Sequence, residues 1–193
     1  MYSDSLSPGL WQGDVLGPVF VPAMASEIRF LPRAQPVTSM TEEQRPEEAI
    51  IRGSWRFVAV VSHECEFNAD KRTRFLVARI QAVPRDLTPE RRVALRESND
   101  VEARARAGQE VASVNTFLFD PAPDAFEEES VADFTSITTL PMGAIEQYVA
   151  LKKAELQPDH RVLFRKKLAW FFSRGLEPPD PEEHEETAEA GSA

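Results

Sequence analysis

The chain has only one cysteine among its 193 residues, so no disulfide framework can form within it. Structural disulfides belong mainly to oxidising compartments, and a reducing cytoplasm is the simplest setting for such a sequence. No apolar segment approaches the roughly 18 residues that would suggest a membrane span. The N-terminal residues also lack the basic segment and apolar run of a secretory signal. We therefore expect a cytoplasmic protein without membrane contact.

An excess of basic residues is also absent. The formal net charge is −10 at pH 7, which argues against simple binding to a DNA or RNA backbone, because such binding needs clustered cations. Seven of the acids lie in residues 176–193, and removing their charges leaves −3. We interpret this segment as an acidic disordered tail. The alternative is that the tail competes with an anionic partner for the basic last helix.

The residues that are present predict a β core. Segment 57–61 is a continuous apolar run of strand length, and segment 73–83 alternates loosely and contains β-branched and aromatic residues. Asn68 and Asp70 lie between these segments and favour a turn. Further strands are expected at 14–21, 27–31, 50–52, 111–119 and 131–140, with an exposed loop over 32–48.

The helices follow from capping and periodicity. Thr88 and Pro89 predict the start of a charged surface helix over 87–107, which Gly108 would end. Segments 144–156 and 160–174 fit two further helices. The last helix has an apolar stripe that we interpret as core packing, formed by Phe164, Leu168, Phe171 and Phe172.

Three stretches of the chain resemble the PemK/MazF-like toxin family. They are Gly13-Asp14-Val15, the stretch from Arg56 to Ser62, and Val77-Ala78-Arg79-Ile80. This resemblance implies an SH3-like antiparallel β-barrel and, for many members, cleavage of single-stranded RNA. It places the family's catalytic arginine on Arg56 and the hydroxyl partner on Gln81, which can form hydrogen bonds but cannot act as an acid or a nucleophile.

A second resemblance concerns the stretch Ser62-His63-Glu64-Cys65-Glu66. It is similar to the Ser-x-x-Cys-Asp strand end of little-characterised bacterial and phage proteins with a barrel-like body and a helical C-terminus. If this stretch continues the strand, His63 and Cys65 point to one face while Glu64 and Glu66 point to the other.

Together these patterns and resemblances predict an α+β fold. Residues 1–140 are expected to form the SH3-like barrel with an inserted loop and surface helix. Residues 141–175 would form a helical extension packed on the barrel, followed by the tail at 176–193.

Two functions are compatible with the sequence. The first is a non-catalytic binding module of bacterial or phage origin, with a protein or nucleic-acid partner and with homodimerisation open. The second is a divergent endoribonuclease that uses Arg56 with His63 or Glu64 in place of the missing hydroxyl residue. Neither requires a cofactor or a metal. The binding residues that we predict are Arg56, Ser62, His63, Cys65, Glu66 and Gln81.

Structural roles compete with these functions. Free cysteines tend to be buried, so we interpret Cys65 first as a small core residue, with a reactive thiol or a metal ligand as the alternatives. A zinc site at His63 and Cys65 would need further ligands, for example His160. Arg56, for its part, is as well explained by an ion pair with Asp14 or a rim glutamate as by a role in binding.

Overall fold

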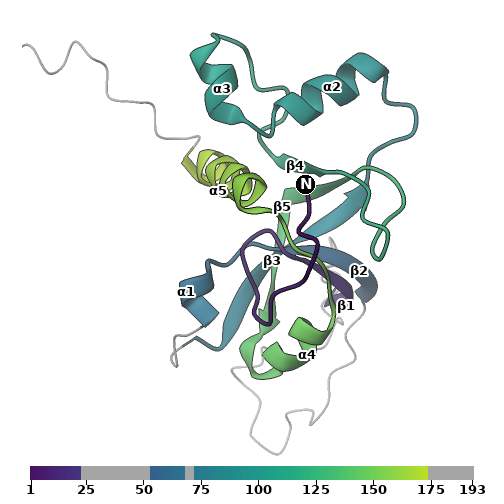
Figure 1. Ribbon diagram of the computed structural model, residues 1–193, viewed down its shortest axis with the longest axis vertical. Coiled ribbons are helices and arrows are strands. Elements are labelled where there is room, and N and C mark those ends of the chain that lie inside the picture. The colour runs from purple at the N-terminus through teal and green to yellow at the C-terminus, as the bar shows by residue number, and fades with distance from the viewer. Residues whose placement is uncertain (23–52, 68–71, 174–193) are drawn as a thin grey trace, which may run out of the picture.

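The computed structural model describes residues 1–22, 53–67 and 72–173. They form an α+β fold around one six-stranded antiparallel sheet with the strand order β4-β5-β3-β2-β1-β6 (Figure 1). The expected strands at 27–31 and 50–52, the expected loop at 32–48 and the tail at 176–193 lie outside the described residues.

Strands and helices are interspersed along the chain. The strands are β1 (Val15–Pro22), β2 (Gly53–Val60), β3 (Arg74–Ala82), β4 (Thr116–Phe119), β5 (Ser130–Pro141) and β6 (Lys152–Ala154). The helices are α1 (Glu64–Phe67), α2 (Pro89–Glu97), α3 (Val101–Arg106), the 3₁₀ turn η3 (Met142–Ala144), α4 (Ile145–Ala150) and α5 (Pro158–Ser173).

Both faces of the central strands are buried. Ala59 and Ala78 face a cluster that includes Phe164 of α5, whereas Val58 and Val60 face a second cluster, against which α4 packs. Successive strand residues point to opposite faces, so β2 contributes to both clusters. The sheet is therefore the middle layer between α5 on one face and α4 on the other (Figure 1).

The described strands form an open sheet. β6 pairs with β1 at one edge, β4 pairs with β5 at the other, and no described pairing joins the two edge strands. The sequence thus predicts the α+β class and the central strands correctly. Closure into a barrel is not seen among the described residues.

The predicted surface helix is two helices. Thr88 caps α2 and Pro89 is its first residue, as expected, but α2 ends at Glu97. Asp100 then caps α3 by accepting a hydrogen bond from the backbone amide of Ala103 at 2.9 Å. The prediction of one continuous helix over 87–107 is wrong because side chains with strong capping preference interrupt it.

Three other boundaries differ from expectation. The predicted helix over 144–156 consists only of α4, and β6 follows it, so the C-terminal segment is not a simple helical pair. The predicted strand over 111–119 is limited to β4. Residues 64–67 form α1 instead of continuing a strand. Within the described ranges, no helix has both the length and the apolar character needed to cross a membrane.

Candidate functional site

Arg56, Arg79 and Gln81 lie on one face of the β2–β3 pair. Val58 is paired with Arg79, and Val60 with Val77. The described β2–β3 pairing ends at Val58 and Arg79, and Arg56 and Gln81 lie two residues further along β2 and β3. Because side chains alternate between faces along a strand, Arg56, Arg79 and Gln81 share one face, which we call the arginine face.

The side chains of the arginine face are exposed. Arg56 Nε donates a hydrogen bond to Ser54 Oγ at 3.0 Å, and Arg79 Nη2 donates to Gln81 Oε1 at 3.4 Å. Neither arginine forms an ion pair with an acid among the described residues, so the alternative pairing of Arg56 with Asp14 is wrong. Within the described ranges neither guanidinium group is neutralised by a carboxylate, and guanidinium geometry suits phosphate.

His63 and Cys65 lie at the other end of the β2–β3 pair. His63 Nδ1 is 3.2 Å from Cys65 Sγ, and both residues are exposed, so the expected burial of Cys65 is wrong. From Arg56 to the end of β2 the strand continues for four residues, or roughly 13 Å at the usual rise. The structure does not bring the imidazole and the thiol to Arg56.

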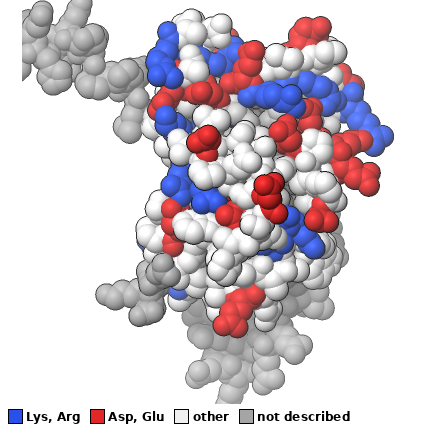
Figure 2. Space-filling model, viewed as in Figure 1, with Lys and Arg blue, Asp and Glu red and all other residues white. Residues whose placement is uncertain are grey.

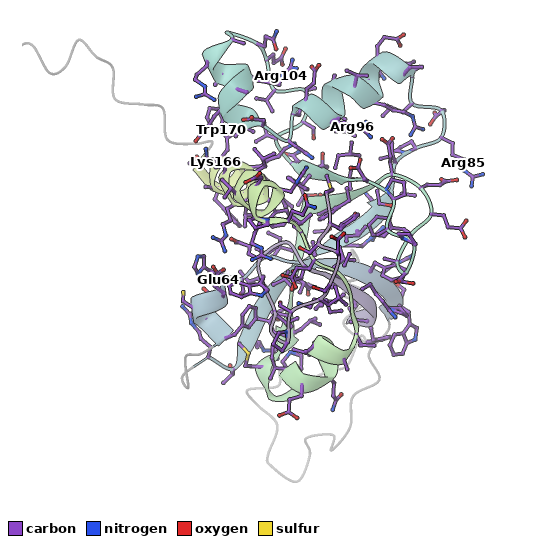
Figure 3. All side chains as sticks on the ribbon, viewed as in Figure 1. Glu64, Arg85, Arg96, Arg104, Lys166 and Trp170 are labelled. Atoms are coloured by element: carbon purple, nitrogen blue, oxygen red, sulfur yellow. The ribbon has the colours of Figure 1, made fainter. Side chains whose placement is uncertain are left out.

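Glu64 and Glu66 are held by other arginines. Glu64 bonds Arg165 of α5, and Figure 3 shows it between α1 and α5. Partial burial would raise the pKa of Glu64, but a backbone hydrogen bond and the contact with Arg165 outweigh burial and lower it. Glu66 lies 3.9 Å from Arg72. Both carboxylates therefore attach α1 to neighbouring parts of the fold.

Ser62 joins strands. Its hydroxyl accepts a hydrogen bond from the backbone amide of Leu76 at 2.9 Å, and its own amide donates to the Leu76 carbonyl at 3.2 Å. The side chain is buried. Ser62 thus extends the β2–β3 pairing past the end of β2.

The basic side chains of α5 are occupied by partners within the fold. Arg161 binds Glu155, Arg165 binds Glu64 and Lys166 binds Glu102. Figure 2 shows charges of both signs interspersed on the face that carries α5. A helix whose cations are already paired attracts phosphate weakly, so α5 is a poorer anion site than the arginine face.

A buried ionic network that no sequence pattern predicts lies at the start of β1. Lys152 Nζ lies 3.1 Å from Asp14 Oδ2 and 2.8 Å from Glu155 Oε2, and all three side chains are buried. The ammonium also donates to Gly9 O at 2.6 Å and to Ser7 Oγ at 3.1 Å. These contacts attach the N-terminal residues to β6.

Gly13, next to Asp14, allows Leu156 to pack against the backbone. Its φ is +92°, and a Cβ there would lie 2.6 Å from Leu156 Cδ1. The Gly13-Asp14 pair, quoted above for the family resemblance, thus has a local structural explanation. Arg161 completes the arrangement: its guanidinium lies 4.8 Å from the centre of the Trp11 ring and binds Glu155 at 3.0 Å.

The two acids of the network have opposite pKa shifts. Burial raises the pKa of Asp14 to about 6, only partly offset by Lys152, and its Oδ1 atom is buried without a described partner. Burial acts in the same direction on Glu155, but hydrogen bonds from Lys152 and Ser7 outweigh it and lower its pKa to about 2. The shifts differ in direction because burial dominates at Asp14, whereas hydrogen bonds dominate at Glu155.

A second buried lysine lies between α5 and the α2–α3 connection. Lys167 is fully buried, and its Nζ is 3.4 Å from Asn99 Oδ1. The Asn99 side chain also accepts from Leu118 N at 2.9 Å and donates to Leu118 O at 2.8 Å, so it covers part of edge strand β4. Burial lowers the pKa of Lys167 to about 7.

Neither a metal site nor a similarity to known proteins indicates which reaction or ligand this site serves. Among the described residues, no group of three His, Cys, Asp or Glu side chains is placed to hold a metal ion. No family model matches the chain, and none of the curated proteins is significantly similar to it in sequence.

Proposed function

We propose that the protein is a non-catalytic binding module whose arginine face engages single-stranded RNA in the cytoplasm. The observation behind this proposal is that Arg56, Arg79 and Gln81 share one exposed face, on which neither arginine forms an ion pair with a described carboxylate, although Asp133 is the cross-strand neighbour of Arg79. Phosphate oxygens are acceptors for exposed guanidinium groups. Two exposed arginines on one face are compatible with binding even when the whole chain is acidic.

The strand connections support a barrel-like core. β1, β2, β3 and β5 are neighbours in that order, and the last strand returns to pair with the first. Membership of the PemK/MazF-like family and a bacterial or phage origin remain part of the proposal.

Binding without cleavage is favoured by the chemistry around Arg56. Gln81 has no proton to transfer at neutral pH, and the side chains of His63 and Glu64 interact with Cys65 and Arg165 beyond the far end of β2. Arg56 can stabilise a negative charge, but no general base is described beside it. The alternative of a divergent endoribonuclease would need such a group from elsewhere.

Anisotropy with a labelled single-stranded RNA separates the possibilities. We expect R56A and R79A to bind several-fold more weakly than the unaltered protein, and R74A to bind normally. Arg74 is the matched control. It lies on β3, its position in the strand places it on the opposite face of the sheet from Arg79, and its side chain donates a hydrogen bond to Thr139. Cleavage that depends on Arg56 would establish the nuclease instead, and equal binding by all variants would reject the arginine face.

A further inference from the structure

A pocket of about 550 Å³ lies between α2 and the ends of β3, β4 and β5. Its size falls within the range of small-molecule sites. Seven of its eleven lining residues are aliphatic or proline, and among them Val83 and Val131 belong to a small buried cluster with Leu118. Leu87 and Leu95 complete the apolar wall. The body of a ligand in this pocket would therefore be apolar.

The way in which α2 is attached explains why the pocket remains open. None of the residues of α2 is buried. The helix is held along one side by Arg92 and Arg96, which both bind Glu129, and by the contact of Arg92 with the Pro84 carbonyl. These polar contacts hold one side of α2 against the fold. The other side of α2 does not fill the space above the sheet, and this space is the pocket.

Arg91 is the charged residue of the pocket, and none of the lining residues is acidic. Arg92, Arg96 and Arg104 each bind a carboxylate, whereas Arg91 forms no ion pair with any acid in the described part of the chain. The side chain is exposed, so it can reach the rim while its methylene groups follow the apolar wall. This arrangement complements a single negative charge.

The remaining polar groups are already engaged with protein partners. Ser113 Oγ and Thr116 Oγ1 lie 2.7 Å apart, and Gln81 Oε1 accepts from Arg79. No aromatic ring lines the pocket, so it lacks the surface on which a nucleobase would stack. The lining thus favours an aliphatic body over a nucleotide.

We propose that this pocket binds an amphipathic carboxylate, with its aliphatic body between α2 and the sheet and its carboxylate on Arg91. A guanidinium can donate two parallel hydrogen bonds to a carboxylate, which fixes the orientation of the ligand. Gln81 belongs both to the pocket lining and to the arginine face, but the inference does not depend on RNA binding by Arg56.

Titration calorimetry with three eight-carbon probes tests the inference. Octanoate, octanol and octylammonium have the same apolar body and differ in the charge of the head group. We expect one octanoate to bind per chain, octanol to bind about tenfold more weakly, and octylammonium more weakly still. Equal affinity for the three probes, or no octanoate binding at millimolar concentration, would overturn the proposal.

Variants locate the site. R91A removes the charge from an exposed position and is expected to weaken octanoate binding about tenfold, with no change for octanol. A94F places a ring in the pocket and is expected to weaken both. R85A is the control, because Arg85 binds Glu128, points away from the molecule in Figure 3 and does not line the pocket. Octanoate binding that survives both R91A and A94F would contradict this site.

Discussion

Lys152 Nζ lies 3.1 Å from Asp14 Oδ2, and both side chains are almost completely removed from solvent. The two residues are 138 positions apart in the sequence. Their contact joins the start of β1 to β6, and the same ammonium group binds Glu155. The edge of the sheet therefore depends on a buried cation between two carboxylates.

Replacing this cation should strongly destabilise the fold. K152M leaves Asp14 and Glu155 buried without their shared partner, and we expect the free energy of unfolding in urea to fall by about 3–5 kcal/mol. K153M is the matched control on the same strand, because no ion pair of Lys153 is found among the described residues. Similar losses for the two variants would show that the buried ammonium is not the cause.

Asp14 should make stability depend on pH. Its pKa is about 6 in the folded protein and 3.8 when unperturbed, so between these values the folded state binds more protons than the unfolded state. Stability from this group should therefore fall as pH rises from about 4 to 6. We expect D14N, compared by urea unfolding across this range, to lose that slope. An unchanged slope in D14N would assign it to other groups.

Lys167 should make the stability of the fold increase with pH above pH 7, whereas Asp14 makes it decrease between pH 4 and 6. Burial lowers its folded pKa from 10.5 to about 7, so the unfolded state binds more protons between these values and stability should rise with pH. K167M removes the buried amine while keeping its approximate shape. We expect K167M to be at least as stable as the unaltered protein at pH 7 and to show less stabilisation between pH 7 and 10. Loss of stability at pH 7 would contradict this account.

Asn99 should stabilise the edge strand β4. Its amide bonds both the N–H and the C=O of Leu118, and N99A would leave two buried backbone groups unpaired, at a cost of about 2–4 kcal/mol. Hydrogen exchange at the Leu118 amide should become faster in N99A. The same exchange rate in both proteins would mean that Asn99 does not protect this strand.

The local features of the fold could be predicted from sequence because local chemistry determines them. The apolar run of β2 and the Thr88-Pro89 helix start are examples, and both are confirmed. The break at Asp100 also had a local signal, since Ser98, Asn99 and Asp100 all favour caps over helix interiors. The prediction of one helix over 87–107 disregards this capping signal.

The tertiary features could not be predicted in the same way. β6 has three residues and is a strand only because β1 lies beside it. Lys152 and Lys167 are buried although lysines are rarely so, and they contact Asp14 and Asn99, which lie far away in the sequence. The family resemblance points to Arg56 and Gln81, and the alternation of side chains along β2 and β3 puts both on the arginine face. His63 and Cys65 share one face only if residues 62–66 continue a strand, whereas residues 64–67 form α1.

The salt dependence of RNA binding is the most direct measurement of the proposed function. Affinity for RNA falls as salt rises, so the slope of log affinity against log salt concentration is negative. Each phosphate contact that is removed should decrease the magnitude of this slope by about 1. We predict this decrease for R56A and for R79A, with an unchanged slope for R74A and intact RNA recovered at the end of each titration. Identical slopes for all three variants, or RNA cut only when Arg56 is present, would contradict the account.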